Sequence, residues 1–332
     1  MTPNPWPSFD SLPLEPNGPP GNAWGLFGPN DQLGMLNLLT PDVIASAAQE
    51  IQQGIRVSLD WPLDKPSYPT FTRKQFEHRI IHESKTPMND DEVHFNTQSS
   101  TQWDGFRHFA FRSSRQFFNG HTQDDFEDPN KLGIDKWVDK GGIIGRGILL
   151  DWASWATRNG REIKPLQSGP VLVNDLKTII KEQNIQIRAG DILFIRVGFT
   201  TAYNALTSTE QVNYPNRQPP GLLGLEATHE SLKWLWESRF AAVASDSPSF
   251  ERGPTTGSYN DPDVSIHQWA LAGWGLPLGE MFDLEELAET ARRLGRFRVV
   301  LRVLLMPWPF SEDELNEERD VKASFQHKKS QI

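Results

Sequence analysis

The chain of 332 residues contains no cysteine. Disulfide bonds, thiolate-bound metals and a cysteine nucleophile are therefore excluded. No apolar stretch approaches the roughly 18 to 20 residues that a membrane-spanning helix requires. Residues 1–22 also lack the basic start and the apolar core of a signal peptide. We therefore expect a cytoplasmic protein without a membrane partner.

Positive charge is also scarce, since 33 Lys and Arg face 43 Asp and Glu, for a net charge of -10. Binding to nucleic acid phosphates needs clustered basic residues, so the composition favours a small-molecule substrate over a nucleic acid. No serine lies in a G-x-S-x-G context, which argues against a Ser–His–Asp hydrolase. The phosphate-binding pattern G-x-x-x-x-G-K-[ST] is absent as well.

Tryptophan, by contrast, is plentiful, with 12 residues. Side chains of this size suit an aromatic core, an interface or an apolar substrate pocket. The distribution of proline and charge predicts one domain at 23–312, preceded by a proline-rich arm at 1–22 and followed by a charged tail at 313–332. We expect the arm to pack over the body of the protein or over a partner subunit.

Hydrophobic patterning predicts alternating strands and helices, and hence an α/β fold. Apolar runs predict buried strands at 142–152, 192–197, 240–244 and 298–305. Helical spacing predicts helices at 173–183, with Asn174 as the N-cap, at 228–238 and at 284–294. Nearer the start, the pattern predicts a helix from Thr40 to Gly54, then a strand at 55–63 and a polar loop at 62–96. Thr40 would be the N-cap of that first helix, with Pro41 at its first position.

Two glutamines, an aspartate and a histidine gather in the segment 98–108. In an extended chain, Gln102 and Asp104 would lie on the same face. Two such oxygen ligands, joined by a distant His and Glu, would satisfy a divalent ion such as zinc or manganese. A hydrogen-bond network within a loop is the alternative for these residues.

This segment resembles the signature of the cyclase family, usually written H-x-G-T-H-x-D-x-P-x-H. Asp104 matches the metal-binding aspartate, and His108 matches the final histidine, which transfers a proton. The two leading histidines of the signature fall on Gln98 and Gln102, which is a clear departure. Further segments resemble the family in the same order, and the resemblance covers roughly residues 24 to 310. They are GRGILLDW at 145–152, GDILFIRVGFT at 190–200 and AAVASDSPSFE at 241–251, followed by His267 and Glu280.

The resemblance implies a cyclase-like swivelling β/β/α domain with a mixed sheet, assembled as a homo-dimer or homo-tetramer. It also implies one divalent metal ion, zinc or manganese, held by Asp104, His267 and Glu280, as in trans-dienelactone hydrolases. Gln102 would add its carbonyl oxygen, and His108 would move the proton. For the substrate we expect contacts from Trp103, Phe106, Arg107 and Gln98. Asp246 is expected either to support the ligands from behind or to cap the end of a strand.

The activity implied is metal-dependent hydrolysis of a cyclic ester or amide, such as a lactone with an aromatic or apolar body, by metal-activated water. Arylformamidase activity on N-formylkynurenine, as in the kynurenine formamidases of the family, ranks second because that signature keeps the histidines replaced here. A non-catalytic small-molecule binder and a natural-product cyclase are further alternatives.

Overall fold

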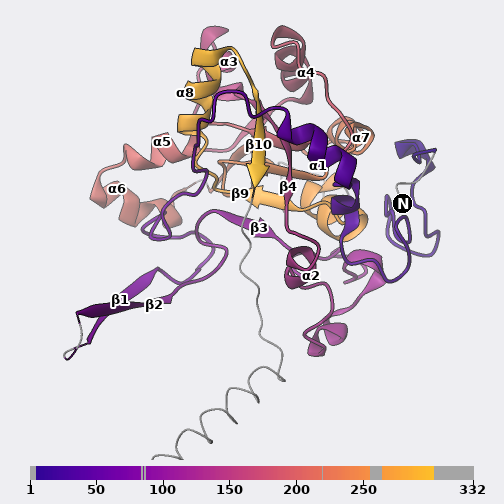
Figure 1. Ribbon diagram of the computed structural model, residues 1–332, viewed down its shortest axis with the longest axis horizontal. Helices are drawn as coiled ribbons and strands as arrows, with labels where there is room; N and C mark the ends of the chain where they lie inside the picture. Colours follow the sequence, from indigo (N-terminus) through magenta and orange to yellow (C-terminus); the bar gives the residue numbers. More distant parts are fainter. Residues whose placement is uncertain (1–4, 84, 86, 219, 255–263, 303–332) are drawn as a thin grey trace, which may run out of the picture.

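The protein is described by a computed structural model, in which residues 5–83, 85, 87–218, 220–254 and 264–302 are placed. A six-stranded mixed sheet organises it, with the strand order β10-β4-β6-β8-β9-β3 (Figure 1). Strands β4, β6, β8 and β9 run parallel, whereas β10 and β3 pair antiparallel at the two edges. The sheet strands are β3 (Gln102–Asp104), β4 (Ile144–Leu150), β6 (Ile192–Ile195), β8 (Ala242–Ser245), β9 (Leu278–Glu280) and β10 (Arg298–Arg302).

Helices cover the sheet, which explains why its central strands read as continuous apolar runs. Helix α1 contacts β4 and β10, while α4 contacts β4 and packs against α3 and α7 (Figure 1). The helices are α1 (Pro41–Ala48), α2 (Asp135–Val138), α3 (Trp152–Arg158), α4 (Val173–Glu182), α5 (Phe199–Asn204), α6 (Ser208–Asn213), α7 (His229–Ser238) and α8 (Glu285–Leu294). Short 3-10 helices are η1 (Phe9–Ser11), η2 (Gly34–Leu38), η3 (Phe118–Gly120), η4 (Gln123–Glu127) and η5 (Tyr214–Asn216), and η7 (Gln268–Trp274) is a π-helix.

The predicted α/β class with a mixed sheet is confirmed. The apolar runs form β4, β6, β8 and β10, although residues 303–305 of the last predicted strand lie outside the described residues. The three later helices are confirmed as α4, α7 and α8. Thr40 caps α1 by accepting the backbone N–H of Val43, and Pro41 opens that helix as predicted. None of the described helices is long and apolar enough to cross a membrane.

Four local predictions were wrong. Helix α1 ends at Ala48, well before Gly54. The N-cap of α4 is Leu172, so Asn174 lies inside the helix. Residues 55–63, all described, form no strand, because no neighbouring strand pairs with their alternating pattern.

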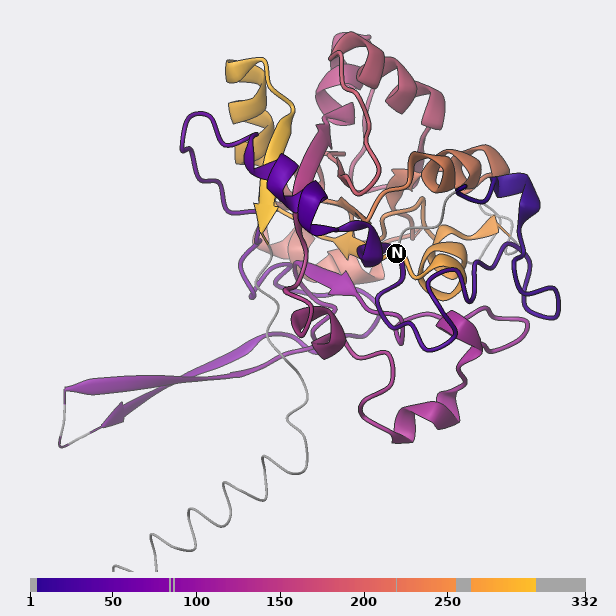
Figure 2. The same cartoon turned by 45° about the vertical axis from the view of Figure 1, so that its right-hand side comes forward.

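The fourth error is the polar loop at 62–96, which contains an antiparallel hairpin of β1 (Glu77–Glu83) and β2 (Met88–His94). Figure 2 shows this hairpin projecting from the body of the protein. Every residue of β2 is exposed. Because neither face of the hairpin is buried against the core, its sequence carries no apolar alternation from which a strand could be read.

The proline-rich arm packs on the body through tryptophan. The indole nitrogen of Trp236 in α7 donates to the carbonyl of Pro7 at 2.8 Å, and that of Trp274 donates to the carbonyl of Gly21 at 2.9 Å. The ring of Phe9 stacks on Trp269, with centroids 5.6 Å apart. The arm therefore covers α7 and the π-helix η7, while the assembly of several chains stays a prediction.

A small β-bridge region brings a second stretch of chain next to the main sheet. Strands β5 (Gly169–Val171) and β7 (Leu223–Leu225) pair in parallel, and Leu225 also bridges to Glu251. Gly224 has no room for a side chain, because a Cβ atom there would lie 2.5 Å from the backbone of Glu251. This close approach fixes the position of the backbone that carries Glu251.

A buried ion pair joins β4 to the start of β6. The guanidinium of Arg146 donates to both carboxylate oxygens of Asp191, at 2.8 and 2.6 Å, and both side chains are 3% exposed. Removing one partner of such a pair leaves an uncompensated buried charge. Glu50 also lies 3.8 Å from Nη1 of Arg146 and would compensate part of its charge. We therefore expect Asp191→Ala to lower the free energy of unfolding by at most about 3 to 5 kcal/mol in chemical denaturation.

The matched control is the double variant Arg146→Met/Asp191→Leu, which removes both charges and keeps the volume. It should recover most of the stability that Asp191→Ala loses, since apolar replacement of a buried pair is often neutral. A loss below about 1 kcal/mol in Asp191→Ala would show that this ion pair contributes no more than an exposed one.

Candidate metal centre

Three buried residues from separate parts of the chain meet at the β3 edge of the sheet. Asp104 ends β3, Glu280 ends β9, and His267 immediately precedes the π-helix 268–274. Gln102 lies directly opposite Glu280 in the antiparallel pairing of β3 with β9. Asp104 lies two residues further along β3, on the same face as Gln102. The register of two short strands therefore sets both carboxylates on one face.

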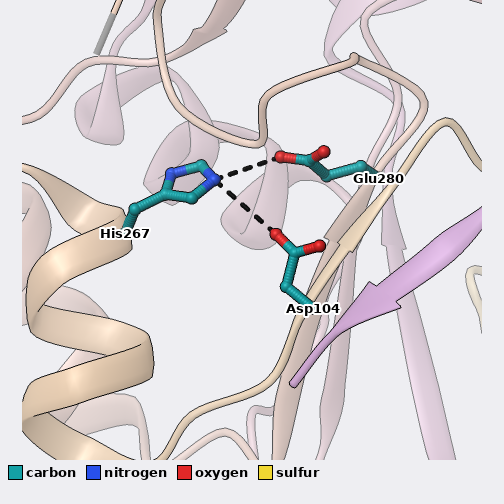
Figure 3. Close-up of side chains that lie close together, drawn as sticks. All are labelled: Asp104, His267 and Glu280. Carbon is teal, nitrogen blue, oxygen red and sulfur yellow. Dashed lines mark hydrogen bonds and ion pairs between the residues drawn. The ribbon is translucent and has the colours of Figure 1, made fainter. Parts of the chain in front are cut away.

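The ligand atoms of Asp104, His267 and Glu280 all lie within 4.8 Å of one another. Nε2 of His267 is 3.1 Å from Oε1 of Glu280 and 3.7 Å from Oδ2 of Asp104, as Figure 3 shows. Asp104 is fully buried, Glu280 is 2% exposed and His267 is 5% exposed. These three residues could hold a metal ion.

A third carboxylate fixes the orientation of the imidazole. Oε1 of Glu251 lies 2.7 Å from Nδ1 of His267, and Glu251 also accepts the backbone N–H groups of Ile266 and His267 and the hydroxyl of Ser265. With Nδ1 held in this way, Nε2 is the nitrogen that faces Asp104 and Glu280. Metal-binding histidines are commonly oriented by such a carboxylate.

Sequence reasoning missed Glu251. The only signal for it was its place as the last residue of the segment 241–251, beyond the aspartate on which attention fell. Its partner His267 lies 16 residues further along the chain. No spacing rule could join the two.

Each glutamine of the signature segment binds one oxygen of a clustered carboxylate. Nε2 of Gln98 donates to Oδ1 of Asp104 at 2.8 Å, and Nε2 of Gln102 donates to Oε2 of Glu280 at 2.7 Å. The other oxygen of each carboxylate faces His267. The metal site and the hydrogen-bond network, which the sequence left as alternatives, therefore coincide in the same residues.

Two buried acceptor atoms in the cluster have no hydrogen-bond partner among the described residues. They are Oδ2 of Asp104 and Oε1 of Gln102. Buried polar atoms without partners are rare in native proteins. A divalent cation held by Asp104, His267 and Glu280 would satisfy Oδ2 of Asp104, and one imidazole nitrogen with several oxygens is a donor set suited to zinc or manganese. The residues present therefore fit the ion that the family resemblance implies.

The protonation of the cluster reflects its crowding. Burial, followed by the charge of Glu280, raises the pKa of Asp104 to about 6. Burial alone would lower the pKa of His267, but its hydrogen bonds to Glu251 and Glu280 outweigh burial and hold that pKa well above the ordinary value. Without a cation, the cluster therefore retains protons that a divalent ion would displace.

His108 links this buried cluster to solvent. Its Nε2 is 3.8 Å from Oδ2 of Asp104, and its side chain is 28% exposed. Burial lowers the pKa of His108, an effect that the charge of Asp104 opposes and the positive charge of Arg73 reinforces. The imidazole is therefore neutral near pH 7 and free to accept a proton.

Trp103 and Phe106, the two aromatic residues predicted to contact a substrate, are both buried. Trp103 alternates to the other face of β3 from its neighbours and meets Phe282 edge-on at 5.2 Å between centroids. Phe106 is fully buried against Phe118 and Trp137. Trp103 does line a groove of about 940 Å³ along residues 50–63, but Asp104, His267 and Glu280 are not among its lining residues. Substrate contacts by Trp103 and Phe106 stay predictions.

The guanidinium of Arg107 is engaged by a neighbouring loop. It donates to the carbonyl oxygens of Lys131, of Pro129 at 2.6 Å and of Asp128 at 3.3 Å, and it stacks over the ring of Phe126. Arg107 therefore organises residues 128–131, and a contact between this side chain and a substrate stays a prediction.

Asp246 caps a helix at the end of β8. Its carboxylate accepts the backbone N–H groups of Val197, Gly198 and Phe199 at 2.7, 2.7 and 2.9 Å, where α5 begins. Burial raises the pKa of Asp246 to about 7, against the opposing hydrogen bond from Val197. These hydrogen bonds cap the start of α5, and the support of metal ligands by Asp246 stays a prediction.

The structure thus combines a mixed α/β fold with a buried carboxylate–imidazole cluster that could hold a metal ion. The family model described as "Putative cyclase" matches residues 41–252. The chain belongs to this cyclase family, as the motifs of residues 98–108 and beyond predicted. A search of curated proteins gave no match.

Solved structures agree on the fold. The crystal structure of a novel cyclase is 27% identical, with a TM-score of 0.72, and the match covers 83% of this chain and 91% of that chain. Isatin hydrolase A from Labrenzia aggregata, bound to benzyl benzoate, is 15% identical with a TM-score of 0.51, covering 76% and 87%. An isatin hydrolase bound to the product analogue thioisatinate is 14% identical with a TM-score of 0.51, covering 70% and 80%.

The geometry predicts which side chains decide metal content. We expect Asp104→Asn and His267→Ala to lose the ion, because the first removes the charge of a carboxylate ligand and the second removes the imidazole nitrogen that faces it. His108→Ala should keep it. The measurement is metal content by mass spectrometry on protein purified without chelators or a His-tag.

Asp283→Asn is the matched control, because this half-buried acid lies three residues beyond Glu280 and outside the cluster. Full metal content in Asp104→Asn would show that the ligands have been assigned to the wrong residues.

The raised pKa of Asp104 predicts a pH dependence of metal binding. Its folded-state pKa, about 6, lies above the ordinary value of 3.8. For the ion-free protein, the stability contributed by this group is present below about pH 4 and is lost as the pH rises through 6. A divalent ion needs the carboxylate form of Asp104. The ion should therefore bind best above about pH 6, where Asp104 is ionised.

We therefore expect the increase in melting temperature on adding zinc or manganese to grow between pH 5 and pH 8, as measured by calorimetry. Calorimetric titrations in buffers of different ionisation enthalpy should also show proton release on binding. An equal increase at both pH values would contradict the prediction.

Proposed function

We propose that this chain is a metal-dependent hydrolase that opens a cyclic ester or amide, with zinc or manganese as its ion. The observation that carries the proposal is the unpartnered Oδ2 of Asp104, which lies between His267 and His108 at 3.7 and 3.8 Å. His267 would complete a set of buried metal ligands. His108, which is partly exposed, would act as a neutral base.

When bound, a divalent ion in such a site supplies Lewis-acid chemistry, lowering the pKa of water and polarising a carbonyl group. Asp104, His267 and Glu280 would hold it, with Oε1 of Gln102 as the further oxygen that the sequence suggested. Glu251 holds the ring of His267 in place through Nδ1. The two glutamine amides hold the carboxylates in their observed orientations.

His108 is suited to the proton transfers of the reaction. Neutral near pH 7, its Nε2 would accept the proton that the attacking water loses. The resulting imidazolium would lie beside Asp104, whose charge raises the pKa of His108. It would then return the proton to the oxygen or nitrogen released when the ring opens.

The choice of a cyclic substrate is supported by the fold relatives. Isatin is an aromatic cyclic amide, and two of the structures that share this fold are described as isatin hydrolases. Their low identity gives this chain the fold alone, so the bond and the ring enter as our proposal.

The proposal is tested with metal-loaded protein on a panel of an aromatic lactone, isatin and N-formylkynurenine. We expect turnover of a ring substrate, and we expect His108→Ala to lower kcat by about 100- to 10,000-fold, as for loss of a general base, with metal content unchanged. His121→Ala, which removes a histidine whose ring pairs with Asp125 at 3.7 Å, is the matched control.

The other outcomes are distinct. Turnover of N-formylkynurenine alone would replace the proposal with the arylformamidase. Metal binding without turnover of any ester or amide would favour a binding protein or a cyclase that adds no water. Unchanged kcat in His108→Ala would remove His108 from the mechanism.

A further inference from the structure

Arg73, to which the sequence analysis assigned no role, lies beside the candidate metal centre. Nη1 of Arg73 donates to the main-chain carbonyl of Gln98 at 2.5 Å. The side chain of Gln98 in turn donates to Oδ1 of Asp104 at 2.8 Å. One residue therefore separates this guanidinium from a carboxylate of the candidate metal centre, and its charge is close enough to act on His108.

The charge of Arg73 is not neutralised within the described part of the chain. No carboxylate among those residues lies within ion-pair distance of it, whereas Arg146, Arg161 and Arg196 all pair with acids. Arg107, the cation first expected to meet a substrate, is already surrounded by loop carbonyls. Arg73 is half-buried and makes one hydrogen bond to a neutral group, which leaves donors of its planar guanidinium for another partner.

The backbone that presents Arg73 is strained. Phe71 and Thr72 have φ values of 61° and 57°, in the left-handed region. For a β-branched residue such as threonine this conformation is a true outlier. Strained residues of this kind persist where the surrounding structure holds them, and they cluster at binding sites. A strained pair directly before a cation beside the cluster therefore points to a function for this turn.

The same turn also exposes an aromatic face. The side chain of Phe71 is 59% exposed, and the guanidinium of Arg73 lies 4.9 Å from the centre of its ring. A planar cation against an aromatic ring combines a charge for an anion with an apolar surface. The pair is suited to an aromatic group that carries a carboxylate.

We propose that Arg73, supported by Phe71, is an anion subsite that binds a carboxylate carried on an aromatic substrate. This inference rests on the proposed function for the reaction that follows binding. The contacts agree with it, since Asp104 and Glu280 face His267 and Arg73 has no carboxylate within ion-pair distance among the described residues. Arg73 would be a specificity-determining residue, because a guanidinium binds a carboxylate through two parallel hydrogen bonds.

The test compares two probes of one shape, benzoate and its neutral counterpart benzamide, by calorimetric titration of the metal-loaded full chain. We expect Arg73→Gln to weaken benzoate binding by about 10- to 100-fold, the range for a hydrogen bond to a charged group. Benzamide affinity and metal content should stay unchanged. Arg73→Lys should recover part of the benzoate affinity, because it restores the charge without the paired geometry.

Arg79→Gln is the charge-matched control, since Arg79 lies on the projecting hairpin, 3.6 Å from Glu92. Equal weakening of both probes in Arg73→Gln would mean a purely structural role and would overturn the proposal. The absence of benzoate binding by the unaltered protein would also overturn it. Arg112 carries a similar guanidinium over the ring of Phe109, and a loss of benzoate affinity in Arg112→Gln but not in Arg73→Gln would overturn the proposal as well.

Binding is measured without turnover, so the two proposals fail separately. Hydrolysis of a ring substrate with unchanged benzoate affinity in Arg73→Gln would remove the subsite and keep the hydrolase. Selective loss of benzoate affinity in a protein that hydrolyses nothing would keep the subsite and remove the hydrolase.

Discussion

The structure depends most on the approach of two buried carboxylates, Asp104 and Glu280, to one imidazole. Both acids are almost fully buried, and charge repulsion between them contributes to the raised pKa of Asp104. Such an arrangement is costly unless protons or a cation compensate the charge. The protein nevertheless builds it with rigid elements, because the pairing of β3 with β9 fixes both acids. A fold that holds two acids together in this way offers a candidate site for a positive ion.

The support around the cluster follows the same logic. His267 could turn its ring freely if Glu251 did not hold Nδ1, and Glu251 is itself anchored by two backbone N–H groups and a hydroxyl. The loop that carries Glu251 is in turn set by the close approach of Gly224. Gly224 thus positions Glu251, and Glu251 positions His267. The geometry of the site therefore depends on residues beyond the three candidate ligands.

The sequence predicted the parts of this protein that depend on local pattern. Buried parallel strands such as β4 and β6 read as apolar runs, and the resemblance around Asp104 predicted the family and the three candidate ligands that the structure brings together. Features that depend on partners distant in sequence were missed. The hairpin at 77–94 is exposed on both faces and so lacks alternation, and the residues at 55–63 have alternation but no neighbouring strand. Glu251 and Arg73 acquire their places through His267 and Gln98, contacts that no spacing rule describes.

The two glutamines are best understood through the atoms they use. A histidine that binds a metal offers a lone pair, whereas Gln98 and Gln102 turn N–H donors toward Asp104 and Glu280. Those hydrogen bonds occupy Oδ1 of Asp104 and Oε2 of Glu280. One oxygen of each acid remains, and both face Nε2 of His267. The departure from the family signature therefore replaces two imidazoles with neutral amides, which orient the carboxylates of the candidate metal centre and leave one oxygen of each facing His267.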